Sequence, residues 1–278
     1  MNTLYPIGLS TALENEQVML ARCGGQEVAV WRDSQGTLHA NQNRCAHRGM
    51  RLHLGFVRDD QLRCPYHGWA YDGSGQCKHI PAHPDIVPAK TICLKTYTVR
   101  ETNSVIWLAP QPALAGAPEE AHATTALPAD LQATPVRSLY LQIEVDRLAQ
   151  AFQALLAAPF ANEATATQLV AVSGNQASWL LGERQIAVAY ERIALGAGSE
   201  AVLVHGEGLA PQGLVYALQD CGGGQAGIHV SALWRGAAPA AYRLGLSQYL
   251  RRVEWFLKNE VALTTQWSPF SQHPGNEA

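Results

Sequence analysis

The sequence has little that would suit a nucleic-acid-binding or membrane protein. Charged residues make up 15% of the 278 residues and the formal net charge is −3, so the basic balance of a nucleic-acid-binding protein is missing. No apolar run reaches the roughly 18–20 residues of a membrane span. The first ten residues lack a basic stretch followed by an apolar one, so no signal peptide is expected. Hydrophobic residues reach 47%, which is enough to bury one or two cores.

Cysteine is sparse and scattered. The six cysteines are Cys23, Cys45, Cys64, Cys77, Cys93 and Cys221. Two of them, Cys45 and Cys64, belong to the motif described below, and we interpret the other four as ordinary buried thiols. This use of cysteine is typical of a reducing compartment, so we predict a cytoplasmic protein.

Residues 1–110 predict an all-β unit. Short strands rich in apolar residues alternate with Gly- and Asp-containing turns, which fall at 24–25, 33–36, 59–60 and 72–75. Such even spacing of brief strands and turns is typical of a small barrel or sandwich.

The composition changes after this unit. Residues 111–135 are rich in Ala, Pro, Thr and Glu and predict a linker. In residues 136–278, several strands precede a long amphipathic helix over about 242–264. A shorter helix is expected at 146–158, where Pro159 ends it. A curved antiparallel sheet around a C-terminal helix is the natural α+β packing for this order of elements.

The strongest motif joins two short loops. Cys45-Ala46-His47 is followed, after sixteen residues, by Cys64-Pro65-Tyr66-His67. Each loop offers one thiolate and one imidazole, which is the ligand set of a Rieske [2Fe–2S] cluster. Structural zinc is the alternative, but zinc motifs usually pair Cys with Cys and His with His. The predicted ligands are therefore Cys45, His47, Cys64 and His67.

These two loops, with Gly49, Gly68 and Trp69, closely resemble those of the Rieske non-heme iron oxygenases. The likeness is nearest to vanillate demethylases and ketosteroid hydroxylases, covers the first 110 residues well and continues weakly to the C-terminus. It implies an all-β Rieske domain followed by a helix-grip (START/Bet v1-like) domain, here shortened. In the high-potential members of the Rieske superfamily a disulfide covers the cluster, and its positions match Met50 and Tyr66, so it cannot form here.

The resemblance also assigns neighbours to the cluster. A serine donor of the high-potential proteins matches Trp69, which implies the lower-potential oxygenase kind. Tyr71 matches a tyrosine donor, and the alternative is a core aromatic. Arg48 belongs to a set of arginines that would form a basic rim able to steer an acidic electron donor, unless they are ordinary solvated side chains. The set is Arg44, Arg48, Arg51 and Arg63.

The family's second metal site is missing from the pattern. Its mononuclear iron uses two histidines and a carboxylate, carried by a motif that resembles D-N-x-x-D-x-x-H-x4-H. Asp146 matches the leading Asp, but the inner Asp falls on Gln150 and the histidines fall on Gln153 and Ala158. We therefore predict no catalytic residue and no mononuclear Fe(II). The family's carboxylate position would fall on the last helix, at Glu254 or Glu260, unless both belong to a solvated face.

Three functional hypotheses follow. The first is an electron-transfer or scaffold subunit that serves a catalytically intact Rieske oxygenase chain in a trimer-type homo- or hetero-oligomer and takes electrons from a ferredoxin or flavin reductase. The second is a complete monooxygenase that hydroxylates or demethylates a small apolar substrate at an unrecognised iron site, with His205 and His229 as ligands. Those histidines are otherwise ordinary core or surface residues. The third is a stand-alone electron carrier or redox sensor.

Overall fold

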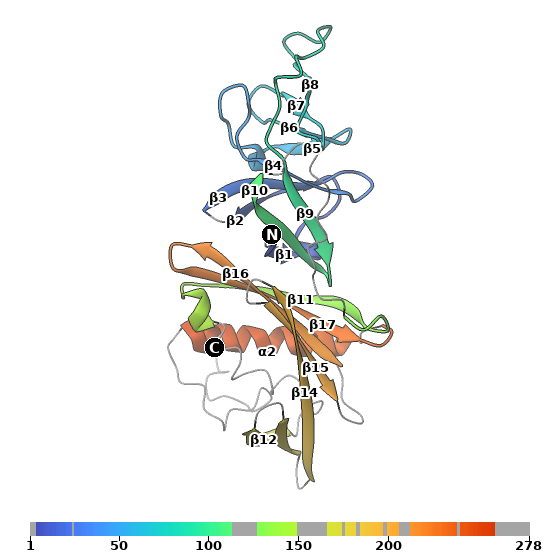
Figure 1. Ribbon diagram of the computed structural model, residues 1–278, viewed down its shortest axis with the longest axis vertical. Coiled ribbons are helices and arrows are strands. Elements are labelled where there is room, and N and C mark those ends of the chain that lie inside the picture. The colour runs from blue at the N-terminus through green and yellow to red at the C-terminus, as the bar shows by residue number, and fades with distance from the viewer. Residues whose placement is uncertain are drawn as a thin grey trace. The chain divides into compact units, whose positions relative to one another are not determined.

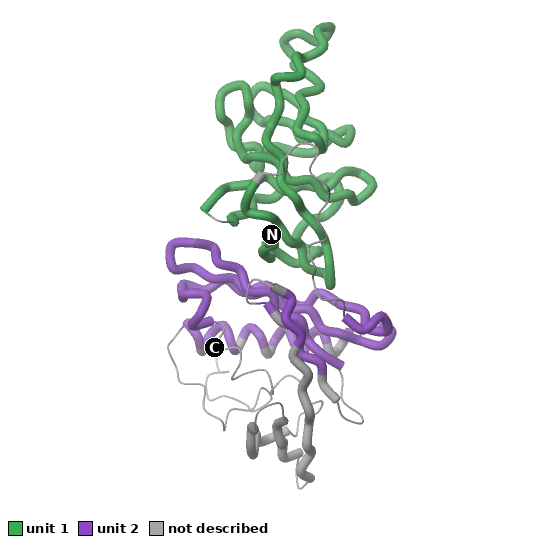
Figure 2. The backbone as a smooth tube through the Cα atoms, in the orientation of Figure 1, with its two compact units in different colours: residues 1–123 green, residues 124–278 purple. Residues whose placement is uncertain are grey.

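The structure is a computed structural model, and it divides the chain into two compact units, 1–123 and 124–278 (Figures 1 and 2). The residues it describes are 4–23, 25–112, 127–148, 166–173, 176–181, 184–196, 199–205, 212–237 and 240–258. The boundary between the units falls inside the predicted 111–135 linker. The finer division into 1–110, 111–135 and 136–278 stays a prediction.

Unit 1 is built from short antiparallel strands in three small sheets, as the turn spacing predicts. Their orders are β1-β10-β9, β2-β3-β4 and β5-β6-β7-β8 (Figure 1). The strands are β1 (Tyr5–Leu9), β2 (Val18–Cys23), β3 (Gln26–Arg32), β4 (Leu38–Gln42), β5 (Phe56–Arg58), β6 (Gln61–Arg63), β7 (Ala70–Tyr71), β8 (Cys77–His79), β9 (Tyr97–Thr102) and β10 (Val105–Pro112). Two single 3₁₀ turns, η1 (Ser10–Ala12) and η2 (Leu52–Leu54), complete the unit.

Strand β3 is buried on both faces. Val28 and Val30 are at most 1% exposed and lie in one core, whereas the alternate residues Ala29 and Trp31 are 0% exposed and lie in a second. This division follows from the two-residue repeat of a strand. The second core also contains both cysteines of the motif, so the predicted ligand loops pack against β3.

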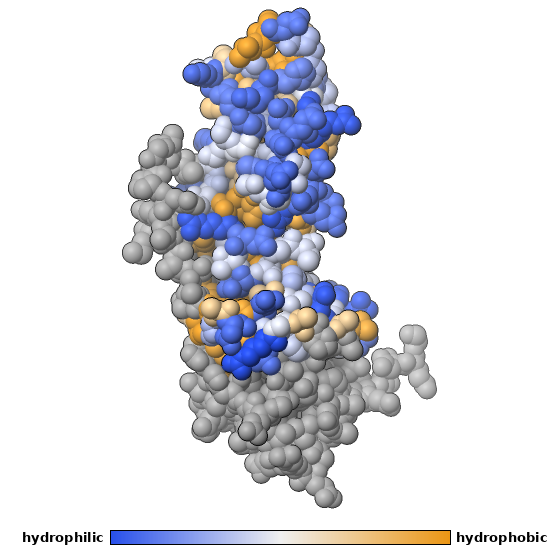
Figure 3. Space-filling view, turned by 90° about the vertical axis from the view of Figure 1, so that its right-hand side faces the viewer, coloured by the Kyte–Doolittle hydropathy of each residue, from blue (hydrophilic) through white to orange (hydrophobic). Residues whose placement is uncertain are grey.

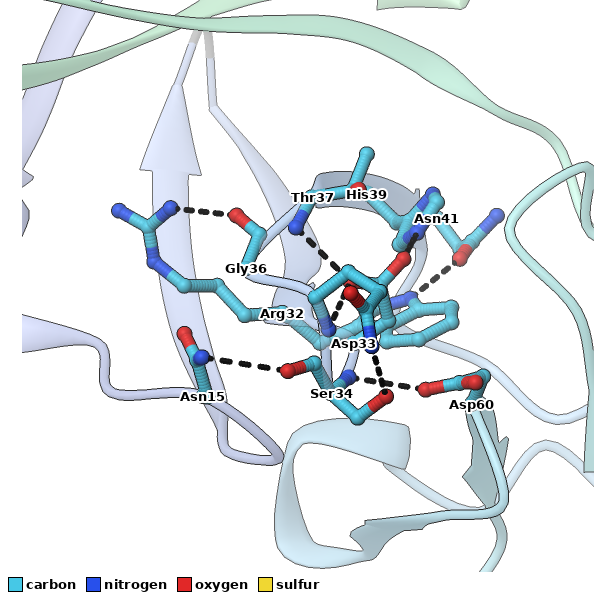
Figure 4. A network of polar contacts seen from close by, with 11 residues as sticks. Asn15, Arg32, Asp33, Ser34, Gly36, Thr37, His39, Asn41 and Asp60 are labelled. Carbon is cyan, nitrogen blue, oxygen red and sulfur yellow. Dashed lines mark hydrogen bonds and ion pairs between the residues drawn. The ribbon is translucent and has the colours of Figure 1, made fainter.

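A polar network fixes the tight turn between β3 and β4 (Figure 4). One carboxylate oxygen of Asp33 accepts the backbone N–H groups of Gln35 (3.1 Å) and Thr37 (2.8 Å). The other lies 3.0 Å from Nε2 of His39, whose ring centroid is 4.3 Å from that of Trp31. The turn is thereby tied to the core beneath the ligand loops.

Unit 2 contains one antiparallel sheet of seven strands, with the order β11-β17-β16-β15-β14-β13-β12. The strands are β11 (Gln132–Leu141), β12 (Ala166–Ser173), β13 (Gln176–Leu181), β14 (Arg184–Gly196), β15 (Ser199–His205), β16 (Gly213–Gly222) and β17 (Gln225–Trp234). From β12 to β17, sequential strands lie side by side, whereas β11 pairs with β17 and not with β12. The first four residues of β11, 132–135, fall within the predicted linker.

Helix α2 (Ala240–Lys258) packs on this sheet, and Figure 1 shows it running beside β11 and β17. Its buried residues Leu246, Leu250 and Val253 follow the spacing of three and four that predicts an amphipathic helix. Arg137 on β11 donates to the hydroxyl of Ser247 at 3.2 Å. The predicted α+β class is therefore confirmed. No helix among the described residues is long and apolar enough to cross a membrane.

The other predicted helix lies mostly outside the described residues. Residues 145–148 are helical, and the N–H of Leu148 donates to the carbonyl of Glu144 at 3.0 Å. The rest of 146–158 falls outside the described ranges, as do residues 259–264 at the end of the predicted C-terminal helix.

The Asp33 turn generates a pH-dependent prediction. Partial burial raises the pKa of Asp33, but hydrogen bonds from His39 and from the Thr37 backbone outweigh it and hold the pKa below its ordinary value. The depressed pKa means that the ionised group stabilises the folded state above about pH 4 and that this contribution is lost as the pH falls further. Asp33→Ala should lower the free energy of unfolding by about 2 kcal/mol at pH 7 and by less at pH 3, as measured by urea unfolding.

Asp33→Asn is the matched control, because the amide oxygen keeps the two backbone hydrogen bonds and loses the charge. It should cost less than Asp33→Ala at pH 7. A difference between wild type and Asp33→Ala that grows on acidification would contradict the assignment.

Candidate functional site: two loops that pair a buried thiol with an exposed imidazole

The first ligand loop, residues 45–50, is a tight turn closed by its own backbone. The N–H of Cys45 donates to the carbonyl of Met50, and the N–H of Gly49 donates to the carbonyl of Cys45, both at 2.9 Å. Gly49 has a φ of +71°, a value that residues with a Cβ rarely adopt. The glycine therefore lets the chain reverse directly after His47.

The second ligand loop, residues 64–69, repeats this backbone pattern. The N–H of Cys64 donates to the carbonyl of Trp69 at 2.9 Å, and the N–H of Gly68 donates to that of Cys64 at 3.0 Å. Gly68 has a φ of +69°. The loops differ in where the imidazole stands, because His47 is the second residue after its cysteine and His67 is the third.

The two loops place the four predicted ligands by type. Cys45 and Cys64 are 4% and 2% exposed and lie in the same core, where the Cys45 thiol is near enough to raise the pKa of the Cys64 thiol. His47 and His67 are exposed, and their ring centroids are 4.8 Å apart. Paired thiols in a dry interior and paired imidazoles at the surface fit a two-iron cluster, in which one iron takes two cysteines and the other two histidines.

The electrostatics of the site suit these donors. Burial raises the pKa of the Cys64 thiol, and the nearby Cys45 thiol also raises it, while backbone N–H groups of Tyr66 and His67 oppose the shift. Desolvation, and then the charges of His67 and Arg48, lower the pKa of His47. His47 is therefore held in the neutral form that binds metal.

Each exposed imidazole is covered by an aromatic ring. The indole of Trp69 stacks on His47 with centroids 4.6 Å apart and planes 2° apart. The ring of Tyr66 lies on that of His67, with centroids 3.8 Å apart. Sequence reasoning singled out Trp69 but assigned no such role to Tyr66. Its place directly before His67 was the available signal.

Tyr71 lies under the first ligand loop and is fully buried. Its hydroxyl oxygen accepts the N–H of Ala46 at 3.2 Å and lies 3.1 Å from Sγ of Cys45. Because the oxygen accepts one hydrogen bond, its own proton is available to the sulfur. The sequence pattern did not predict that the backbone N–H groups of Tyr66 and His67 lower the pKa of Cys64, because this effect depends on the folded loop.

The four arginines near the ligands divide into two pairs. Arg51 and Arg63 form ion pairs with Glu27 (3.2 Å) and Asp59 (2.9 Å). The other two, Arg44 and Arg48, are exposed and make no ion pair with a described residue. The positive charge that remains at the first ligand loop is therefore carried by these two side chains.

The positions of the family's second metal site are only partly described. Asp146 is exposed, whereas Gln150, Gln153, Ala158 and Glu260, like the side chain of His205, lie outside the described residues. Glu254 forms an ion pair with Lys258 at 2.7 Å. In the described part of the chain, no three His, Cys, Asp or Glu side chains converge as a single metal ion requires. The four predicted cluster ligands would serve two irons as two pairs, so this observation does not bear on them.

His229 is fully buried in strand β17. Its Nδ1 lies 2.8 Å from the hydroxyl of Ser138, and its Nε2 lies 3.1 Å from Oε1 of Gln219. Burial lowers the pKa of His229 to about 4. Both ring nitrogens already have partners within the sheet, which is the arrangement of a structural core histidine and not of a metal ligand.

Comparison with known proteins identifies the first unit. Residues 3–98 match the family model of the Rieske [2Fe–2S] domain. The oxidoreductase NdmD of Pseudomonas putida is 44% identical over 108 residues, which are 38% of this chain and 18% of that protein. The 4beta-methylsterol monooxygenase of Methylococcus capsulatus is 41% identical over 119 residues, which are 41% of this chain and 32% of that protein. The chain thus spans less than a third of the length of either relative.

Solved structures extend the likeness in fold to both units. Apo dicamba monooxygenase aligns with a TM-score of 0.64 at 16% identity and covers 93% of this chain and 86% of that chain. A mutant of NdmA from Pseudomonas putida, solved with caffeine, aligns with a TM-score of 0.62 at 17% identity over 100% of this chain and 84% of that chain. The protein therefore carries a Rieske [2Fe–2S] domain, and its predicted resemblance to the Rieske non-heme iron oxygenases is confirmed.

The Tyr71 hydroxyl generates a prediction about the reduction potential. Hydrogen bonds to cluster sulfurs raise the potential because they stabilise the more negative reduced state. A hydrogen bond with a net value of about 1 kcal/mol corresponds to roughly 40 mV for one electron. Tyr71→Phe should therefore lower the midpoint potential by roughly that amount, measured by redox titration.

Tyr97→Phe is the matched control. Tyr97 is also a buried tyrosine of unit 1, but it lies in the other core and its hydroxyl donates to Oε1 of the exposed Gln26. It should leave the potential unchanged. Equal shifts in the two variants would show that Tyr71 acts only through general stability.

Proposed function

We propose that this protein is the electron-transfer or scaffold subunit of a Rieske oxygenase system, and that Cys45, His47, Cys64 and His67 hold its [2Fe–2S] cluster. The observation that carries the proposal is the sorting of the four donors, with both thiols buried and both imidazoles exposed. When bound, the cluster supplies one-electron transfer at a potential raised by its two neutral imidazole ligands.

The residues around the ligands have separate tasks in this proposal. Tyr71 and the backbone of the second loop stabilise negative charge on the sulfurs. Trp69 and Tyr66 fix the planes of the two imidazoles and exclude water from one face of each. Arg48 beside His47 favours the neutral imidazole and presents a positive charge to an approaching partner.

The chemistry on O2 is proposed to take place in another chain. The positions at which the family pattern has the inner Asp and the two histidines are Gln150, Gln153 and Ala158. Amide and methyl side chains are poor ligands for Fe(II), and His229 is engaged in the sheet. The protein would thus act in a trimer-type homo- or hetero-oligomer beside a catalytically intact subunit, with a ferredoxin or flavin reductase as donor, in the cytoplasm.

A relative gives this arrangement a precedent in name. The toluene-4-sulfonate monooxygenase system iron-sulfur subunit TsaM1 of Comamonas testosteroni is 37% identical over 107 residues. The matched residues are 38% of this chain and 30% of that protein, whose name describes an iron–sulfur subunit of a monooxygenase system.

The second candidate is a complete monooxygenase that hydroxylates or demethylates a small apolar substrate. The fold match to dicamba monooxygenase over 93% of the chain favours it, because unit 2 exceeds what a plain electron carrier needs. This candidate requires a third iron bound by residues outside the family positions.

Metal content distinguishes the electron-transfer subunit from the complete monooxygenase. Purified protein should contain two irons and two acid-labile sulfides per chain, and His67→Ala should abolish the Rieske signal in electron paramagnetic resonance (EPR) spectra of the reduced protein. Cys64→Ser should abolish the signal as well. His83→Ala is the control for an exposed histidine in the same unit, and Cys93→Ser is the control for Cys64→Ser, because Cys93, predicted from the sequence to be a buried thiol, is exposed. Both controls should keep the signal.

A third iron that supports O2-dependent turnover by the isolated chain would overturn the electron-transfer proposal in favour of the monooxygenase. A signal that survives in Cys64→Ser and is lost in Cys93→Ser would overturn the ligand assignment. Co-purification with a Rieske chain that has an intact His-x4-His motif would support the subunit role.

A further inference from the structure

The loop between β8 and β9 carries an exposed apolar tip, which we call the apolar prong and define as Ile86 and Val87. These side chains are 61% and 89% exposed, and Val87 is the most exposed large hydrophobic side chain among the described residues. Figure 3 shows hydrophobic and hydrophilic residues side by side at the end of unit 1 where this loop lies in Figure 1. Adjacent exposed apolar residues on a loop mark a contact surface more often than isolated ones do.

The loop is held in one conformation. Its backbone turns twice, with the N–H of His83 bonded to the carbonyl of Ile80 (2.9 Å) and that of Ile86 bonded to the carbonyl of His83 (3.2 Å). Prolines fix φ at positions 81, 84 and 88. The side-chain amide of Gln76 donates to the carbonyl of Ala89 at 3.2 Å. A prong ordered in advance loses little entropy when it binds a partner.

The base of the loop packs against the ligand loops. A Cβ added to Gly68, the residue after His67, would lie 2.9 Å from Cγ of Pro81. Ile80 and Ile92, at the two ends of the loop, both pack against the core that holds the cysteine ligands. The prong is therefore anchored to the structure that presents the exposed imidazoles.

Exposed positive charge is carried by the prong loop and by the first ligand loop with the residue before it. Lys90 belongs to the prong loop, Arg48 to the ligand loop, and Arg44 directly precedes Cys45; none of the three makes an ion pair with a described residue. Asp85 is the single acidic residue among residues 80–96. A partner that meets this surface must offer carboxylates around an apolar centre.

We propose that the apolar prong and the cations Arg44, Arg48 and Lys90 form the docking surface for an acidic one-electron carrier protein of the ferredoxin type. The inference rests on the proposed electron-transfer function. One electron leaves the reduced carrier, which is oxidised, and enters the oxidised cluster, which is reduced, and no bond forms or breaks. The charges steer the encounter, and the prong provides the apolar contact.

The test uses the full-length protein with its cluster, and reduced plant-type [2Fe–2S] ferredoxin as the probe. Stopped-flow absorbance measures cluster reduction by the ferredoxin and, separately, by dithionite. Ile86→Ser with Val87→Ser should slow the ferredoxin reaction about tenfold and leave the dithionite reaction unchanged. Leu244→Ser is the matched control, because Leu244 is equally exposed, at 61%, but lies on α2 of unit 2. It should change neither rate.

Charge reversal tests the second half of the proposal. Lys90→Glu should slow the ferredoxin reaction at low salt, and the difference from wild type should shrink as salt screens the charges. The EPR signal and the dithionite reaction of this variant should match those of wild type, because Lys90 lies on the prong loop and not beside a predicted ligand.

The outcomes separate this proposal from the one it rests on. Wild-type protein without a reducible cluster would overturn the proposed function and the docking surface together. A cluster that dithionite reduces, but that ferredoxin reduces equally fast in wild type and prong variant, would overturn the docking surface alone. A prong variant that changes the oligomeric state, and not the ferredoxin rate, would show that the occupant is a second copy of the chain.

Discussion

The site depends on one constraint, which is that two sulfurs must lie side by side in a dry core while their partner imidazoles reach the surface only two or three residues away. The chain meets this requirement with the same closed turn used twice, each with a glycine of positive φ as its next-to-last residue. The turn reverses the backbone so quickly that Cys45 points inward and His47 outward, and the second loop does the same with Cys64 and His67. A side chain at either glycine would strain the reversal.

The rest of unit 1 supports these turns. Strand β3 supplies residues to two cores at once, and Trp31 on its inner face ties the ligand core to the Asp33 turn through His39. The polar groups beside the ligands then divide by type. Hydroxyl and backbone donors meet the sulfurs, and aromatic rings cover the imidazoles. Charge on the buried side and stacking on the exposed side are thus controlled by different residues.

Much of this organisation was predictable from local patterns. The ligand types and spacing, the brief strands of unit 1 and the amphipathic α2 follow from side-chain chemistry and from periods of two and of three to four residues. The stack of Tyr66 on His67 and the anchoring of residues 80–92 by Gln76 were not predictable. They depend on where separate segments meet, which no local period encodes. The lost histidines at Gln153 and Ala158 remain a prediction from sequence.

The sequence by itself determined the set of available donors. Each of the two short loops contains one cysteine and one histidine, and these residue types do not depend on how the chain folds. It also predicts that unit 2 lacks the family's two histidines, whose positions would fall on Gln153 and Ala158. Only the tertiary structure decided which donor is buried, that His229 is engaged by Ser138 and Gln219, and that the base of the prong loop packs at Pro81 against the second ligand loop. Burial and hydrogen-bond partners depend on contacts between residues far apart in the chain, and those contacts exist only in the folded protein.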